Sequence, residues 1–160
     1  MFCFACFTGQ RFSDISRFDK NHFRDNKWQF NAFKTKKKTV VPFEGFIANA
    51  IPILEKYNFN LPIISNQKFN NYLKEFGELA ELNNNVRKLR YTGIKEIEFL
   101  QPKYEYMSSH MARRTFVTIM IEKGVPLTII QKITQHADIR TLVKYEGHSE
   151  SSLIAAFKNT

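Results

Sequence analysis

The stretch SSHMARRTFVTIMIEKGVPLTIIQKITQHADIRTLVKY, residues 108–145, decides the fold of this chain. Its first half has apolar residues three and four positions apart, the period of an amphipathic helix: Ala112, Phe116, Ile119 and Met120. Ser108 and Ser109 are typical N-cap residues, and Gly124 is typical of a helix end. The sequence therefore predicts a helix from about 109 to 123.

Two shorter helices are predicted after this one. Pro126 suits the start of a helix whose inward-facing residues are Leu127, Ile130 and Ile133. Asp138 can cap a third, short helix that ends near Tyr145. The C-terminal part of the chain is thus expected to be helical.

Towards the N-terminus, the pattern changes from helical to alternating. Phe2–Phe7 is a continuous apolar run that stops at Gly9, and residues 12–18 resume a helical spacing, which predicts a helix, a sharp turn and a second helix. Residues 28–33 alternate between apolar and polar, and residues 39–42 follow a lysine-rich connection. These two segments predict a β-hairpin with a basic tip.

The middle of the chain is more polar. Residues 44–57 and 66–82 carry apolar residues at helical spacing, with Pro52 and Pro62 as interruptions, so helices joined by short loops are expected. Residues 90–99 mix apolar and charged residues, and we expect them to be mostly loop. The predicted fold is one domain, mostly α-helical with a small antiparallel sheet (α+β).

Composition favours an anionic partner. The 160 residues include 24 Lys and Arg against 15 Asp and Glu, which gives a formal charge of +9 and an isoelectric point near 9.6. Nucleic acid is the first expectation and an anionic membrane surface the second.

Other classes of protein have no support in the sequence. The apolar run at residues 116–121, which includes Thr118, is far shorter than the roughly 20 residues that span a bilayer. Phe2–Phe7 lacks a preceding basic region and a following small-residue cleavage site, so it is no signal peptide, and a cytoplasmic protein is expected. Cys3 and Cys6 have no second pair to complete a zinc site, and no metal or cofactor is expected.

The first helix of the C-terminal stretch carries a candidate anion site. His110 and Arg113 are three positions apart, so they share one face of the helix near its N-terminus. Free backbone N–H groups and the helix dipole favour a phosphate there. A surface histidine and arginine on a capped helix would, however, look the same.

Several motifs together resemble the tyrosine recombinase (phage integrase) family. The C-terminal signature of the family is matched by His110-Met-Ala-Arg113-Arg-Thr-Phe, Gly124-Val-Pro, Gln135-His136-Ala-Asp and Tyr145. Its first arginine motif is matched by residues 8–14, and its catalytic-lysine hairpin by Phe33-Lys34-Thr35 with Val40-Val41-Pro42. Two positions depart from the pattern, because Gln135 stands where glycine is common and Arg114 where a second histidine is common.

The resemblance implies the catalytic-domain fold of this family over residues 1–160, and an enzyme that cuts and rejoins double-stranded DNA at specific sites, as the integrases of bacterial mobile elements do. Only ten residues precede Arg11, so a fragment is expected that lacks the first helix and the N-terminal DNA-binding domain. The full-length protein would act as a homo-tetramer on DNA, and the isolated domain would be a monomer. The tail, residues 149–160, would pack on a neighbouring protomer.

The resemblance also assigns roles to six residues. Tyr145 would attack the scissile phosphate and form a 3′-phosphotyrosyl bond without metal or ATP. Arg11 and Arg113 would clamp the phosphate, because guanidinium groups match its geometry. Lys34 would protonate the leaving 5′-oxygen, His110 would assist proton transfer, and His136 would hydrogen-bond the phosphate.

Alternatives remain open for several residues. Asp14 is either a surface charge or a brace for Arg11, His136 could be a core histidine, and Lys34 could belong to a solvated basic turn. DNA backbone contacts are expected from six further cations, which a solvated surface could also explain: Lys36, Lys37, Lys38, Arg87, Lys88 and Arg90. The rival function is a non-catalytic DNA-binding or regulatory module.

Overall fold

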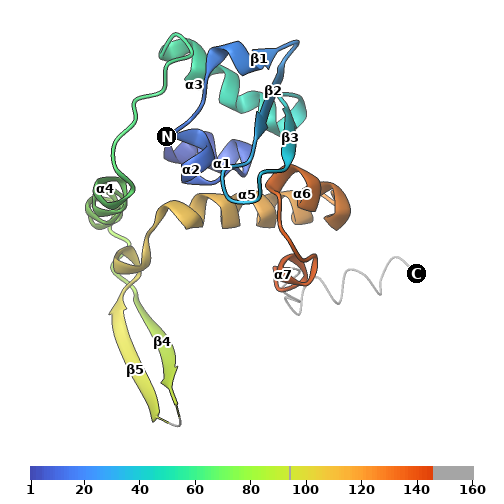
Figure 1. Ribbon diagram of the computed structural model, residues 1–160. Coiled ribbons are helices and arrows are strands. Elements are labelled where there is room, and N and C mark those ends of the chain that lie inside the picture. The colour runs from blue at the N-terminus through green and yellow to red at the C-terminus, as the bar shows by residue number, and fades with distance from the viewer. Residues whose placement is uncertain (94, 146–160) are drawn as a thin grey trace.

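Helix α5 (Ser109–Glu122) lies at the centre of the fold, with helices and a small sheet packed along it (Figure 1). The computed structural model describes residues 1–93 and 95–145. The predicted C-terminal helices are confirmed as α5, α6 (Leu127–Thr134) and α7 (Arg140–Val143). The core around α5 is formed by apolar residues that are fully or almost fully buried, among them Phe4, Trp28, Val41, Ala112, Phe116, Ile130 and Leu142. In the described ranges, no helix has the length and apolar character that crossing a membrane requires.

The predicted helix, turn and helix at the N-terminus are confirmed. Helix α1 (Phe2–Thr8) packs on α5, and α2 (Phe12–Ile15) follows after Gly9. Gly9 has a φ of 68°, and a Cβ there would lie 2.4 Å from a ring carbon of Phe116. Only glycine fits this turn, which brings the segment after α1 against the central helix.

The predicted β-hairpin is confirmed as part of a three-stranded antiparallel sheet. Strand β2 (Lys27–Asn31) pairs with β3 (Lys38–Pro42) in the register Trp28↔Val41, and both of these side chains are fully buried. The sheet also contains a two-residue strand, β1 (Phe23–Arg24), which follows the 3₁₀ helix η1 (Lys20–His22).

The helices expected in the middle of the chain are present. They are the 3₁₀ helix η2 (Gly45–Ala50), α3 (Ile51–Lys56) and α4 (Asn66–Leu79). Pro52 lies in the first turn of α3, where a missing N–H costs nothing, so it does not interrupt the helix. Pro62 lies in the irregular link between α3 and α4.

The expectation of a loop over residues 90–99 is wrong. Strands β4 (Asn85–Thr92) and β5 (Lys95–Pro102) form an antiparallel hairpin that projects from the body, followed by the 3₁₀ helix η3 (Lys103–Tyr106) (Figure 1). All of β5 except Pro102 is exposed, so the strand lacks the alternating burial of a half-buried strand. The turn after Thr92 contains Gly93 with a φ of 63°.

Candidate active site

The N-terminus of α5 is held in place by α4. Asn70 Oδ1 accepts a hydrogen bond from the backbone N–H of Ser109 at 2.8 Å, and Asn66 Oδ1 accepts one from Ser109 Oγ at 3.0 Å. Ser108 is the N-cap residue, as predicted, but its side chain makes no capping bond. The two asparagines therefore position the turn that carries His110 and Arg113.

Arg113 is a buried charge at the junction of three segments. Its side chain points into the protein, and the residue is only 2% exposed. Nη1 donates to the main-chain oxygen of Gly9 at 3.0 Å, and Nη2 donates to that of Thr134. Burial, and then the positive charge of Arg11, lower the pKa of Arg113 to about 9. An anion beside this guanidinium would relieve both effects.

Arg11 approaches the same region from the N-cap of α2. Its Nη2 donates to the main-chain oxygen of Gln135 at 2.9 Å, and its buried Nη1 has no hydrogen-bond partner within the described residues. Arg11 and Arg113 are thus bound to consecutive carbonyls at the end of α6, those of Gln135 and Thr134. Arg11 and Arg113 are 102 positions apart in the sequence, but both bind the turn that ends α6. The positive charge of Arg11 is accordingly one of the causes, after burial, of the lowered pKa of Arg113.

The open question about Asp14 is answered in favour of a brace. The residue is 3% exposed, and its Oδ2 lies 3.9 Å from Arg11 Nη1. Oδ1 accepts a hydrogen bond from the backbone N–H of Phe33 at 2.7 Å. Asp14 therefore connects Arg11 to the basic turn between β2 and β3, next to Lys34.

The two histidines of the predicted site are shifted towards their neutral forms. Burial, then Arg113, Arg114 and Arg11, lower the pKa of His110. Burial, then Arg113, Arg11 and His110, lower the pKa of His136 to about 4. His136 Nδ1 lies 2.7 Å from Thr134 Oγ1 and 3.3 Å from Arg113 Nη2, so the imidazole is held at the end of α6 beside the buried guanidinium.

A cavity of about 340 Å³ lies beside Arg11, Arg113 and His110. Its lining residues are Arg11, Phe12, Ser13, Asn66, Ser109, His110 and Arg113. The sequence did not point to Asn66, because a lone polar residue in an asparagine-rich segment has no distinguishing pattern. Ser109 was expected only as a helix cap.

Tyr145 lies just after α7, half-buried, with its backbone N–H bonded to the oxygen of Leu142 at 2.8 Å. The guanidinium carbon of Arg114 lies 5.6 Å from the centroid of its ring. Of the six predicted site residues, Arg11, His110 and Arg113 thus line one cavity, His136 contacts Arg113, and Tyr145 contacts Arg114, the neighbour of Arg113 in α5.

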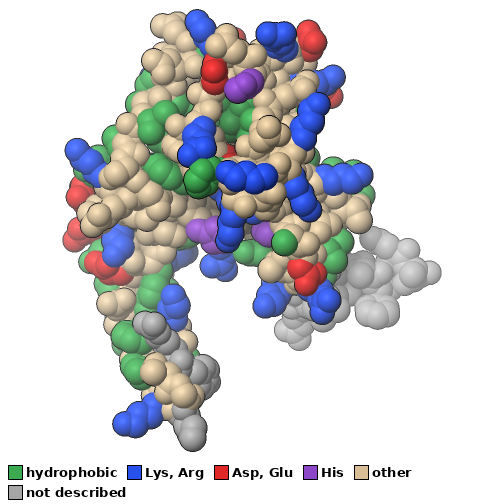
Figure 2. Space-filling view, in the orientation of Figure 1, with side chains coloured by type: hydrophobic (Ala, Val, Ile, Leu, Met, Phe, Trp, Pro, Cys, Tyr) green, Lys and Arg blue, Asp and Glu red, His purple; other side chains and the backbone are tan. Residues whose placement is uncertain are grey.

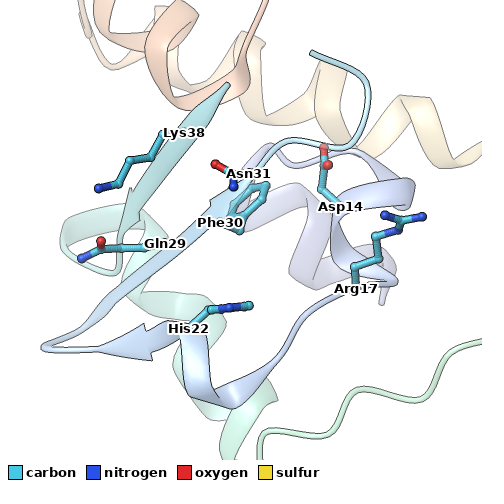
Figure 3. A pocket seen from close by; sticks show the side chains of 7 residues that line it. All are labelled: Asp14, Arg17, His22, Gln29, Phe30, Asn31 and Lys38. Atoms are coloured by element: carbon cyan, nitrogen blue, oxygen red, sulfur yellow. The ribbon is translucent and has the colours of Figure 1, made fainter. Parts of the chain in front are cut away.

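Lys34 is the sixth, and it is not brought into contact with the others. It is exposed on the turn between β2 and β3. Lys36 and Lys37 lie on the same turn, and Lys36 Nζ is 4.7 Å from the centroid of the Phe33 ring. Lys38, on β3, lines a separate cavity of about 570 Å³ together with Asp14, Arg17 and His22 (Figure 3).

The cations predicted on the second hairpin border a groove beside α5. Arg87 Nε pairs with Glu98 at 2.7 Å, and Lys88 Nζ lies 5.2 Å from the centroid of the Tyr106 ring. Both residues line a groove of about 790 Å³ that also includes His110 and Arg114. Lys and Arg side chains gather over β2 and β3 and around the hollow between the β4–β5 hairpin and α7 (Figure 2). The side chain of Arg90 and the tail at 149–160 lie outside the described part of the chain.

Metal ligands do not cluster in the part of the chain that the structure describes. No group of three or more His, Cys, Asp or Glu side chains there is arranged to hold a metal ion.

Comparisons with known proteins identify the family. Residues 1–151 match the model of the phage integrase family. A probable integrase/recombinase of Acholeplasma phage L2 is 30% identical over 125 residues, which are 78% of this chain and 39% of that protein. The chain thus spans well under half the length of this curated relative.

Solved structures support the same fold. The XerA recombinase has a TM-score of 0.61 at 16% identity, over 96% of this chain and 54% of that one. XerH recombinase bound to a palindromic difH substrate has 0.63 at 16%, over 97% and 43%. The Tn1549 transposon integrase in complex with a circular intermediate DNA has 0.62 at 15%, over 99% and 57%. The chain belongs to the phage integrase family, and its fold is that of the tyrosine recombinase catalytic domain.

Proposed function

We propose that this chain is the catalytic domain of a site-specific DNA recombinase or integrase, which cleaves and rejoins DNA through a covalent bond to Tyr145. The observation that carries the proposal is the meeting of Arg11, Arg113 and His110 at one cavity. Membership of the phage integrase family and complexes of related folds with DNA support it.

The two arginines would bind the non-bridging oxygens of the scissile phosphate. Planar guanidinium groups donate to phosphate in pairs, and their charge offsets the charge that builds up in the pentacoordinate transition state. Nη1 of Arg11 faces Asp14 Oδ2 at 3.9 Å but makes no hydrogen bond among the described residues, and it would donate one to the phosphate. His136, next to Arg113, would hydrogen-bond the same phosphate.

Cleavage would be a transesterification in which no bond energy is lost. The phenolic oxygen of Tyr145 would attack phosphorus, the bond from phosphorus to the 5′-oxygen would break, and a 3′-phosphotyrosyl bond would remain. His110, held neutral at the cavity, would accept or relay the phenolic proton, and Lys34 would deliver a proton to the leaving 5′-oxygen. Rejoining would follow the reverse path, so the step needs neither a metal nor ATP.

The basic surface would hold the DNA on both sides of the cleaved bond. Lys36, Lys37 and Lys38 are exposed beside the Lys34 turn, and the β4–β5 hairpin carries Arg87, Lys88 and Arg90. For the isolated chain we expect non-specific binding with a dissociation constant of roughly 10⁻⁴ to 10⁻⁶ M that weakens steeply with salt. The full-length protein would assemble as a homo-tetramer on DNA, whereas the isolated domain would be monomeric.

A covalent trapping assay tests the proposal. The chain is incubated with a nicked suicide substrate in EDTA, and the products are separated on a denaturing gel. A recombinase leaves a protein–DNA adduct that Tyr145→Phe cannot form. Binding to the cognate site without any adduct would favour the rival function, a non-catalytic DNA-binding module, and cleavage that EDTA abolishes would indicate a metal-dependent nuclease.

A further inference from the structure

Asn66, the first residue of α4, lies in the wall of the cavity that contains Arg11, His110 and Arg113. We propose that Asn66 is a further phosphate-binding residue of this site, a role that rests on the proposed function. Its side-chain amide would donate a hydrogen bond to a non-bridging oxygen of the scissile phosphate, from the wall formed by α4.

The orientation of the amide supports this role. Asn66 Oδ1 accepts the hydrogen bond from Ser109 Oγ at 3.0 Å. A primary amide has its oxygen and its NH₂ group on opposite corners, so a fixed oxygen leaves the two N–H donors facing elsewhere. Because Ser109 and Asn66 both line the cavity, the donors of Asn66 are placed at its edge.

A donor on the α4 wall would complement the two arginines in binding a phosphate. Arg113 already donates to the main-chain oxygens of Gly9 and Thr134, and Arg11 already donates to that of Gln135. Part of the hydrogen-bonding capacity of both guanidinium groups is therefore used inside the protein. A phosphate has several acceptor positions, and a neutral amide can satisfy one of them without adding a charge that would compete with the arginines.

The backbone around Asn66 favours an anion as well. Asn66 begins a helix of 14 residues, and the N-cap Ser65 satisfies only the N–H of Lys68, at 3.2 Å. The first N–H groups of α4 are therefore available, and the helix dipole is positive at this end. This electrostatic contribution comes in addition to the cavity and to Nη1 of Arg11, which makes no hydrogen bond among the described residues.

Asn66→Asp separates phosphate binding from a purely structural role. The aspartate keeps an acceptor for Ser109 Oγ and places a negative charge in the first turn of α4, so folding should be preserved or improved. It also removes the donor and repels a phosphate. We expect cleavage at saturating DNA to fall by at least ~100-fold in Asn66→Asp and by about 10-fold in Asn66→Ala.

Gln67→Glu is the matched control, because it makes the same change of charge in the same turn at an exposed residue outside this cavity. Its cleavage rate should stay within about 2-fold of the unchanged chain. If Asn66 only supported Ser109, the order would be reversed, with Asn66→Ala impaired and Asn66→Asp active. That order would overturn the proposal and leave the proposed function intact.

A second measurement does not depend on catalysis. Inorganic phosphate, compared with sodium chloride at equal ionic strength, should raise the melting temperature of the unchanged chain and of Gln67→Glu, but not of Asn66→Asp. This result would support the role of Asn66 even if no covalent adduct were found. An absence of any phosphate effect in the unchanged chain, or an equal effect in both variants, would overturn it.

Discussion

Arg11 donates a hydrogen bond from Nη2 to the main-chain oxygen of Gln135 at 2.9 Å, across 124 positions of the sequence. Gln135 has a φ of 56°, in the left-handed region, where it ends helix α6. This conformation turns the carbonyl of Gln135 towards Arg11. It also gives a physical reason for the glycine that is common at this position in the family, since only glycine adopts such a φ without strain.

Gln135→Gly should therefore be stabilising. Relief of the left-handed strain outweighs the greater freedom of glycine in the unfolded chain, and we expect the free energy of unfolding to rise by about 0.5 kcal/mol. Gln135→Val should lower it by about 1–2 kcal/mol, because β-branched residues are rarely tolerated there. Urea denaturation of both variants measures these changes, and a glycine variant less stable than the valine variant would refute the explanation.

Gly9→Ala should be among the most disruptive single substitutions in the chain. The added Cβ would lie 2.4 Å from the Phe116 ring, at a residue with a φ of 68°. We expect the free energy of unfolding to fall by about 2–5 kcal/mol. Gly45→Ala is a matched control, since its φ is 54° but nothing lies within 4 Å of the added atom.

The control should cost only the backbone strain, about 1 kcal/mol. Thermal or urea denaturation of the two variants compares them directly. Equal losses would mean that the contact between Gly9 and Phe116 does not limit the turn.

Asp14→Asn should separate the two contacts of this carboxylate. The asparagine can still accept the hydrogen bond from Phe33 N–H, but it no longer offers a charge to Arg11. We expect a loss of about 1 kcal/mol for Asp14→Asn and about 2–3 kcal/mol for Asp14→Ala. Hydrogen exchange of the Phe33 amide provides the specific readout, with protection retained in the asparagine variant and lost in the alanine variant. Rapid exchange of this amide in the unchanged chain would contradict the contact.

Acid should destabilise the fold partly through His136. Its pKa is lowered to about 4 by burial and then by Arg113 and Arg11, whereas the unfolded value is about 6.5. Between these values the unfolded chain binds a proton that the folded chain does not, so the free energy of unfolding falls as the pH falls through this window. Above about pH 6.5 the residue is neutral in both states, and the stability is fully present.

Urea denaturation over this pH range should thus have a smaller slope for His136→Gln than for the unchanged chain. His110, whose pKa is also lowered, contributes in the same direction and remains in the variant. Identical slopes would show that His136 is not buried beside Arg113 in the folded protein.

Features with a local signal could be predicted from the sequence. The period of three and four around Phe116 predicts α5, and the alternation around Trp28 predicts the hairpin of β2 and β3. Glycine at position 9 marks the sharp turn. In each case one buried face imposes the pattern on neighbouring residues.

Features without a local signal in the sequence could not be predicted. The β4–β5 hairpin is exposed along most of its length, so no face is selected to be apolar. Asn66 and Asn70 meet Ser109 across the fold, and nothing in their neighbourhood marks them. The three-residue spacing of Arg11 and Asp14 fits either a surface pair or a brace, because spacing does not reveal burial.

The complex trapped on nicked DNA tests the central claim most directly, through its crystal structure. We predict a phosphorus atom bonded to the phenolic oxygen of Tyr145, with Arg11 and Arg113 both donating to the other oxygens of that same phosphate. A covalent bond to another residue, or a phosphate contacted by only one of the two guanidinium groups, would contradict the account.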